Sequence, residues 1–110
     1  MSYEAIFVVL PRGTADSVMA TAKKAGAKGG TVFLARGTGA KEAKTFFGLT
    51  VEEAKEILFV LTERQETDRI LQTIIDAAHL ENPGSGIAFV LDIRKTVGLV
   101  SRQPGVDPSN

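Results

Sequence analysis

Four short apolar runs, separated by turn residues and amphipathic stretches, organise this chain of 110 residues. They predict strands over Ala5–Leu10, Thr31–Ala35, Glu56–Leu61 and Ile87–Leu91. Apolar side chains fill nearly every position of the first and third runs, whereas a half-buried strand would alternate apolar with polar residues. Both faces of the predicted sheet are therefore apolar.

Two segments between these strands have apolar residues at helical spacing, which predicts two helices. The first begins after the capping residue Thr14 and ends before Gly26, a residue suited to the position after a helix. The second begins at Thr62, which has capping-box spacing with the glutamine three residues later, or at Thr67. Residues 36–54 have no periodicity and are expected to be irregular.

The order strand, helix, strand, strand, helix, strand predicts an α+β fold. It is the ferredoxin-like βαββαβ sandwich, with two helices on one face of an antiparallel four-stranded sheet. Two helices leave the second apolar face uncovered, and an apolar patch of that extent is rarely left to water. The simplest cover is another copy of the chain, so the pattern predicts a homo-oligomer.

Composition narrows the class of protein. The length suits one domain, residues 1–110, and thirteen basic residues balance thirteen acidic ones, which does not favour binding to nucleic acid. The chain has no cysteine, so thiol catalysis and cysteine-based metal sites are excluded. No apolar run approaches the ~20 residues that span a bilayer, so we expect no direct membrane insertion. The start of the chain lacks the basic region of a signal peptide, and we expect a cytoplasmic protein.

Candidate catalytic or metal-ligating residues are few. His79 is the only histidine, and it stands at a predicted helix end without a recognisable set of ligands. Glu52, Glu53 and Glu56 have no neighbours that would desolvate them, so we interpret them as a solvated face. The sequence therefore predicts no metal site, no catalytic residue and no enzymatic activity.

Two glycine-rich loops at strand ends carry the candidate binding chemistry. Arg36-Gly37-Thr38-Gly39-Ala40-Lys41 combines two cations, a hydroxyl and flexible amides, which suits a phosphate. Pro83-Gly84-Ser85-Gly86 leads into the fourth strand, and we expect Gly86→Val to block a ligand there while leaving the fold mostly intact. Each loop also has an ordinary interpretation, as a turn or a connection. Between them, the adjacent Phe46 and Phe47 either pack on the domain or form a partner-binding surface.

Three pieces of the chain, in this order, resemble the PII signal-transduction family. The likeness is to its short-loop PII-like (nitrogen regulatory protein P-II-like) branch. The pieces are Gly26-Ala27-Lys28-Gly29-Gly30-Thr31, Arg36-Gly37-Thr38-Gly39 and Gly84-Ser85-Gly86-Ile87-Ala88-Phe89-Val90. The resemblance implies a homotrimer with an adenine nucleotide (ATP, ADP or AMP) as regulatory ligand in the clefts between subunits, and no obligatory cofactor.

The resemblance also implies roles for individual segments. Residues 36–54 would be a T-loop-like segment that contacts a membrane transporter or metabolic enzyme, with Phe46 and Phe47 as partner-binding residues. Residues 80–86 would be a B-loop-like segment on the phosphates, and residues 93–110 a C-terminal loop and tail. The implied ligand-binding residues are Thr31, Arg36, Gly37, Thr38, Gly39, Lys41, Gly84, Ser85, Gly86, Ile87, Lys95 and Arg102.

The chain departs from longer-loop members of the family. Its T-loop-like segment has no tyrosine to modify, and Ala40-Lys41 replaces the glutamine that would accompany 2-oxoglutarate sensing. Ile87 replaces a lysine, and the paired arginines of the C-terminal loop fall near Gly98 and Val100. Weak nucleotide binding, a smaller ligand and no nucleotide all stay open. The alternative function is a ferredoxin-like trimeric assembly or interaction protein without nucleotide binding.

Overall fold

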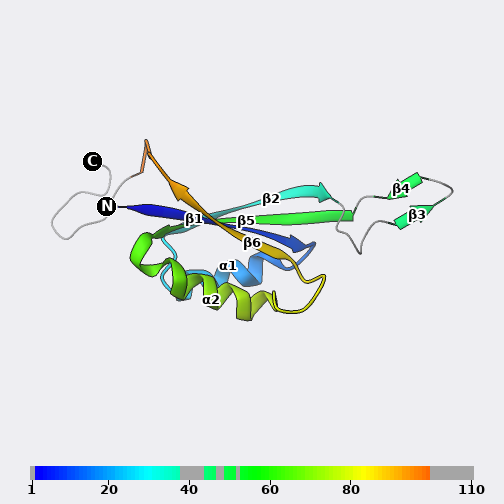
Figure 1. The fold of residues 1–110 in the computed structure, drawn as a ribbon, viewed down its shortest axis with the longest axis horizontal. Coiled ribbons are helices and arrows are strands. Elements are labelled where there is room, and N and C mark those ends of the chain that lie inside the picture. Colours follow the sequence, from blue (N-terminus) through cyan, green and yellow to red (C-terminus); the bar gives the residue numbers. More distant parts are fainter. Residues whose placement is uncertain (1, 38–43, 47–48, 52, 100–110) are drawn as a thin grey trace.

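A computed structural model of the chain describes residues 2–37, 44–46, 49–51 and 53–99. Strands β2, β5, β1 and β6 form one antiparallel four-stranded sheet in that order, and β3 pairs with β4 in a separate two-stranded sheet. The predicted α+β, ferredoxin-like arrangement is confirmed (Figure 1). The elements are β1 (Tyr3–Pro11), α1 (Ala15–Lys24), β2 (Gly29–Gly37), β3 (Lys44–Phe46), β4 (Leu49–Val51), β5 (Glu53–Glu63), the 3-10 helix η1 (Arg64–Glu66), α2 (Thr67–Ala78) and β6 (Ile87–Ile93).

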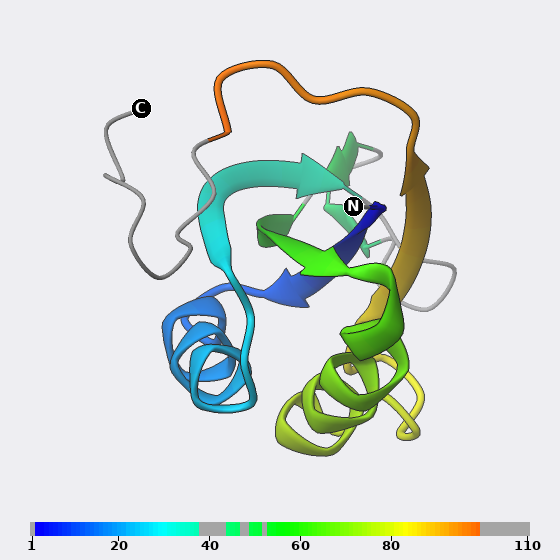
Figure 2. The ribbon, with the colours of Figure 1, turned by 90° about the vertical axis from the view of Figure 1, so that its left-hand side faces the viewer.

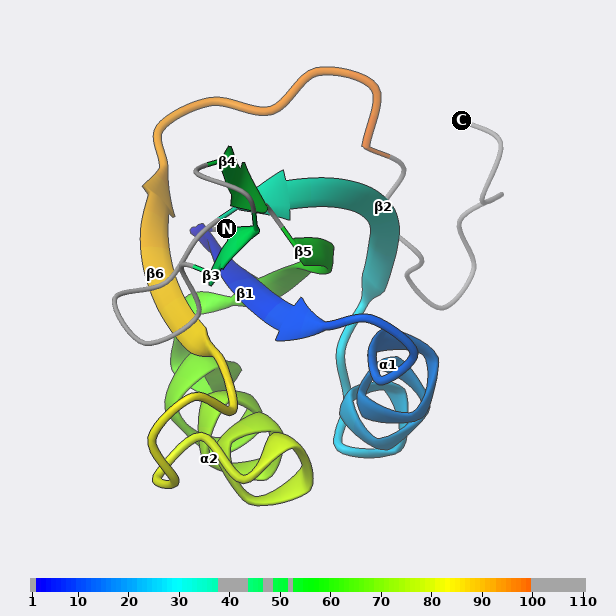
Figure 3. The same cartoon turned by 90° about the vertical axis from the view of Figure 1, so that its right-hand side faces the viewer.

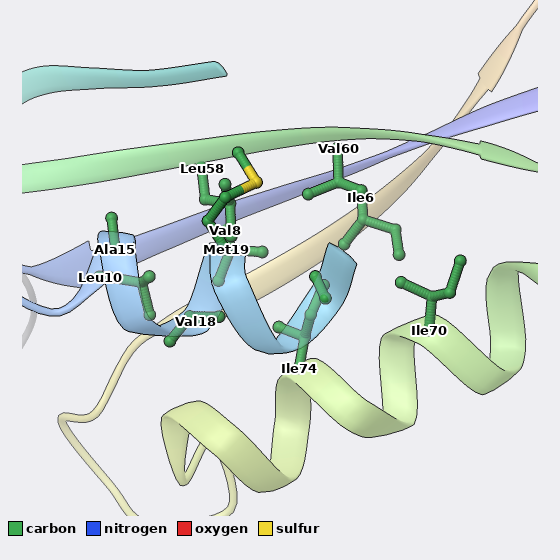
Figure 4. Packing of buried hydrophobic residues seen from close by; sticks show 11 residues of the cluster. Ile6, Val8, Leu10, Ala15, Val18, Met19, Leu58, Val60, Ile70 and Ile74 are labelled. Carbon is green, nitrogen blue, oxygen red and sulfur yellow. The ribbon is translucent and has the colours of Figure 1, made fainter. Parts of the chain in front are cut away.

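Both helices lie on one face of the four-stranded sheet (Figures 2 and 3). Alternate residues of the two central strands point toward them, because side chains along a strand alternate between its faces. Ile6 is the register partner of Val60, and Val8 is that of Leu58. These side chains are fully buried and pack with apolar residues of α1 and α2, as Figure 4 shows. The core therefore lies between the helices and this face.

The opposite face of the sheet carries four phenylalanines, Phe7, Phe33, Phe59 and Phe89, which we call the open aromatic face. Phe7 is the register partner of both Phe59 and Phe89. Its ring makes edge contacts with Phe59 and Phe33 at centroid separations of 5.6 and 5.9 Å. Phe33 and Phe89 are still 40% and 48% exposed. The two-sided apolar character predicted from the strand pattern is thus present in the folded chain.

α1 begins directly after Thr14, as predicted, but neither Thr14 nor Thr62 caps a helix with its side chain in the predicted way. The Thr14 hydroxyl donates to the Pro11 carbonyl at 2.8 Å and caps no helix amide. Thr62 lies within β5, where its buried hydroxyl is 2.6 Å from that of Thr67 and donates to the Glu4 carbonyl at 3.3 Å. α2 begins at Thr67, the alternative start. The capping predictions were wrong because both hydroxyls find partners elsewhere in the fold.

Residues 36–54 are not irregular throughout, which corrects the prediction for this segment. Gly37 and Glu53 still pair as the ends of β2 and β5, and beyond them β3 and β4 pair with Thr45 opposite Thr50. Figure 1 places this β3–β4 hairpin beyond the end of the four-stranded sheet. The two runs are rich in strand-forming residue types and stand close in sequence, so their pairing requires little loop closure.

Gly30 allows α1 to lie close to β2, and we expect its replacement to be costly. A Cβ at this position would overlap the end of the Met19 side chain and lie 3.0 Å from the Phe59 carbonyl oxygen, whereas a Cβ at Gly29 would meet nothing within 4 Å. Gly30→Ala should therefore lower the free energy of unfolding by about 1 kcal/mol, because the Met19 side chain must take another rotamer and the Phe59 carbonyl must shift slightly. Gly29→Ala is the matched control. Equal melting temperatures for the two variants would contradict this account.

Candidate functional site

The two glycine segments lie at the same end of the four-stranded sheet. β2 ends there with Arg36 and Gly37, and the loop that contains Gly84, Ser85 and Gly86 leads into β6 there. Cross-strand pairing shows this, because Phe33, Ile57, Val9 and Ile87 form one row across the four strands. The ordering of the strands thus gathers the two segments at one end.

The same two segments lie on opposite edges of the sheet, because β2 and β6 are its edge strands. Three inter-strand spacings of about 4.8 Å separate these edges, so the two edge strands lie about 14 Å apart across the sheet. Arg36 is exposed at one edge, and Gly84 is exposed at the other. One chain therefore does not bring the predicted phosphate-binding residues around a common point.

The loop before β6 contains two glycines with different roles. Gly84 has φ +83°, and a Cβ there would meet nothing within 4 Å, so its backbone is open to a ligand. Gly86 has φ +143°, and a Cβ there would lie 2.5 Å from the Val9 carbonyl oxygen and 3.1 Å from Leu80 Cδ2. The expectation that Gly86→Val leaves the fold mostly intact is therefore wrong, because the loop packs closely on β1 at this residue.

The remaining predicted ligand-binding residues are distributed over the sheet. Thr31 is exposed on β2, and its register partner is Phe59, so its side chain shares the open aromatic face. Ile87 is 51% exposed at the start of β6. Lys95 follows the other end of β6 and is thus at the far end of the sheet from Gly84. Residues 94–99 leave β6 on the side of the sheet opposite the helices (Figures 2 and 3).

For six of the predicted binding residues, the structure describes the backbone alone or does not describe the residue. Phe46 belongs to β3 and is not in a loop. The predicted residues that lie outside the described parts of the chain are Thr38, Gly39, Lys41, Phe47 and Arg102. Their roles stay predictions.

Glu56 has a role that sequence analysis missed. It is partly buried, and its Oε1 accepts a hydrogen bond of 2.9 Å from the Ala15 amide at the start of α1. The interpretation of Glu56 as part of a solvated face is therefore wrong. The signal was present in the sequence: Glu56 begins an otherwise apolar run, where an unpartnered carboxylate would be costly.

The far end of the sheet is held by ion pairs. Arg64, directly after β5, pairs with Glu4 of β1 at 3.3 Å and also with Asp92 of β6. Lys28 lies 4.0 Å from Glu63. The basic partners are about half exposed, so each pair stabilises the fold only slightly, but the pairs join β5, β1 and β6 where the C-terminal segment departs.

Among the described residues, no group of three or more His, Cys, Asp or Glu side chains could hold a metal ion. None of the helices in the described ranges is long and apolar enough to cross a membrane.

The βαββαβ fold, with glycine segments at one end of its sheet, defines a ferredoxin-like domain of the kind found in PII proteins. The chain matches the family model of the nitrogen regulatory protein P-II over residues 3–103. It therefore belongs to this family of signalling proteins, and the resemblance noted in the sequence is confirmed.

Its structure is also similar to a solved structure of B. subtilis GlnK. The TM-score is 0.66 at 18% sequence identity, over 88% of this chain and 90% of that one. This likeness confirms the fold. No curated protein sequence matches the chain.

Proposed function

We propose that this protein is a non-enzymatic PII-like signalling protein. It binds an adenine nucleotide in clefts between the subunits of a homotrimer and regulates a partner protein through residues 36–54. Its membership of the P-II family supports a signalling role. The observation that carries the proposal is the placement of Arg36 and Gly37 at one edge of the sheet and Gly84 at the opposite edge, both at the same end.

In an oligomer, these segments can come together from two different copies of the chain, although they lie on opposite edges of the sheet within one copy. If neighbouring subunits meet edge to edge, Arg36 of one copy approaches the Gly84 loop of the next. A cleft then has a cation on one wall and an open glycine backbone on the other, which is the chemistry of a phosphate site. The open aromatic face supplies the apolar surface that such an assembly would bury.

The β3–β4 hairpin supports the proposed partner-binding role of residues 36–54. It pairs with itself and with no strand of the four-stranded sheet, and it stands beyond the end of that sheet (Figure 1). A hairpin placed in this way can reach a partner without disturbing the core. A membrane transporter or a metabolic enzyme is the class of partner that we propose.

We expect Arg36→Ala to weaken nucleotide binding about tenfold or more. Hydrogen bonds to charged groups contribute ≈ 1.5–3 kcal/mol, and each 1.4 kcal/mol is tenfold in affinity. Isothermal titration calorimetry with ATP, ADP and AMP measures this effect. Lys24→Ala removes an exposed cation from the last turn of α1 and is the matched control, with affinity unchanged.

Two results would contradict the proposal in different ways. If Arg36→Ala and Lys24→Ala bind a nucleotide equally well, the phosphates are not at the end of β2. If a trimeric wild-type protein binds none of the three nucleotides, the assembly function without nucleotide replaces the sensor function. The exposed Ile87, in the place of a basic residue, is the feature that favours that second outcome.

A further inference from the structure

We infer that Glu56 is a positioning residue that couples the hairpin end of the sheet to helix α1. Glu56 stands near the start of β5, the strand that enters the sheet from the β3–β4 hairpin. Its Oε1 accepts the amide hydrogen of Ala15 at 2.9 Å, across a sequence separation of 41 residues. A strand side chain thus provides a cap that α1 lacks in its own sequence.

The contact is important to α1 because Ala15 is fully buried. The first amides of a helix have no acceptor within the helix and carry a partial positive charge. Thr14, the N-cap residue, has helical backbone angles, and its hydroxyl donates to Pro11 instead. Without Glu56, the Ala15 amide would lose a charge-assisted hydrogen bond at a buried position, where replacement by water is hindered.

The register of β5 decides where this carboxylate lies. Glu56 pairs with Leu10 of β1 and with Leu34 of β2, so it belongs to the part of β5 that lies inside the sheet. Two residues earlier, Ala54 pairs with Arg36 of β2, and β1 provides no pairing beyond Lys55. β5 therefore joins the hairpin to the sheet through a two-stranded ribbon.

Fraying or displacement of this ribbon that extends along β5 as far as Glu56 would move its carboxylate away from Ala15. By the same thermodynamic coupling, a capped α1 holds the start of β5 in register. A regulatory role for this link rests on the proposed function. A partner or ligand that moves residues 36–54 would then also change the stability of the start of α1. The link itself requires no ligand, so it can be tested in the unliganded protein independently of nucleotide binding.

Amide hydrogen exchange of the unliganded protein tests the coupling. We expect Glu56→Ala to accelerate exchange about fivefold at two places, the first turn of α1 and the Ala54–Lys55 amides of the ribbon, which is the effect of losing one cap. Glu56→Gln keeps an acceptor oxygen and should accelerate exchange only about twofold at the same places. Amides around Ile70 in α2 report global unfolding and should accelerate by no more than the same factor, because loss of the cap also lowers the free energy of unfolding.

Glu63→Ala is the matched control, because it removes a carboxylate from the other end of β5 and should leave both places unchanged. If Glu56→Ala accelerates amide exchange only in α1 and not in the ribbon, Glu56 is a local helix cap and the coupling is overturned. A Glu56→Gln variant as strongly affected as Glu56→Ala would overturn the acceptor role. If Glu56→Ala does not fold, the twofold response of Glu56→Gln at both places remains the test.

Discussion

Replacing Phe89 with glutamate is expected to convert the proposed homotrimer into monomers. Phe89 is 48% exposed in the single chain, so solvent reaches a carboxylate there and the subunit itself can still fold. In a trimer that buries the open aromatic face, three carboxylates would be desolvated together. The penalty for each buried unpaired charge is several kcal/mol, so three of them together would oppose assembly strongly.

Light scattering at micromolar concentration measures the outcome. The variant should have a mass near 11.7 kDa, the mass of one chain, and the wild type about three times that value. Phe89→Leu keeps the apolar surface and should stay trimeric. Gln72→Glu adds the same charge to the exposed side of α2 and should also stay trimeric. A trimeric Phe89→Glu variant would show that the open aromatic face is not the interface. A monomeric wild-type protein would contradict the proposed nucleotide site between subunits.

The fold was predictable because the strand pattern carries information about both faces of the sheet. In the first strand, Ile6 and Val8 alternate with Phe7 and Val9. A period of two places these pairs on opposite faces whatever their partners are. Two helices then account for one face, and the structure shows that Ile6 and Val8 are the buried pair. Elements with such strong periodicity are determined by local sequence.

The position at which α1 begins was predictable, but the groups that cap it were not, because they depend on contacts between distant residues. Thr14 and Thr62 both match capping rules, but a capping rule considers only the next few residues. In the structure the acceptor at the start of α1 is Glu56, and Thr62 is inside a strand that runs on to Glu63. Capping rules use only neighbouring residues, whereas these hydrogen-bond partners are distant in sequence and come together only in the tertiary structure.

The candidate site was predictable in its parts but not in its arrangement. The glycine segments were identified from composition, whereas their position at one end and on opposite edges follows from the register of four strands. The separate roles of Gly84 and Gly86 also depend on packing, because only Gly86 faces the Val9 carbonyl. A sequence motif treats the two glycines alike.

Gly86→Val is accordingly expected to destabilise the fold strongly, by about 2–6 kcal/mol. The φ of +143° is a conformation that residues with side chains rarely adopt, and this strain alone costs of order 1–3 kcal/mol. The new Cβ would also lie 2.5 Å from the Val9 carbonyl oxygen. This oxygen belongs to the backbone of a central strand, so it cannot move aside as a flexible side chain would, and overpacking adds a further penalty of about 1–3 kcal/mol.

Gly84→Val separates the effect of strain from that of packing. Its φ of +83° is also unfavourable for valine, but a Cβ there meets nothing within 4 Å, so we expect only the smaller loss of about 1–3 kcal/mol. Urea unfolding at one fixed protein concentration measures both variants, because oligomer stability depends on concentration. A Gly86→Val midpoint equal to that of Gly84→Val would mean that the loop moves off β1 without cost. If the expected order is found, loss of nucleotide binding in Gly86→Val reports a damaged fold, and Gly84 is the position at which a phosphate contact can be tested.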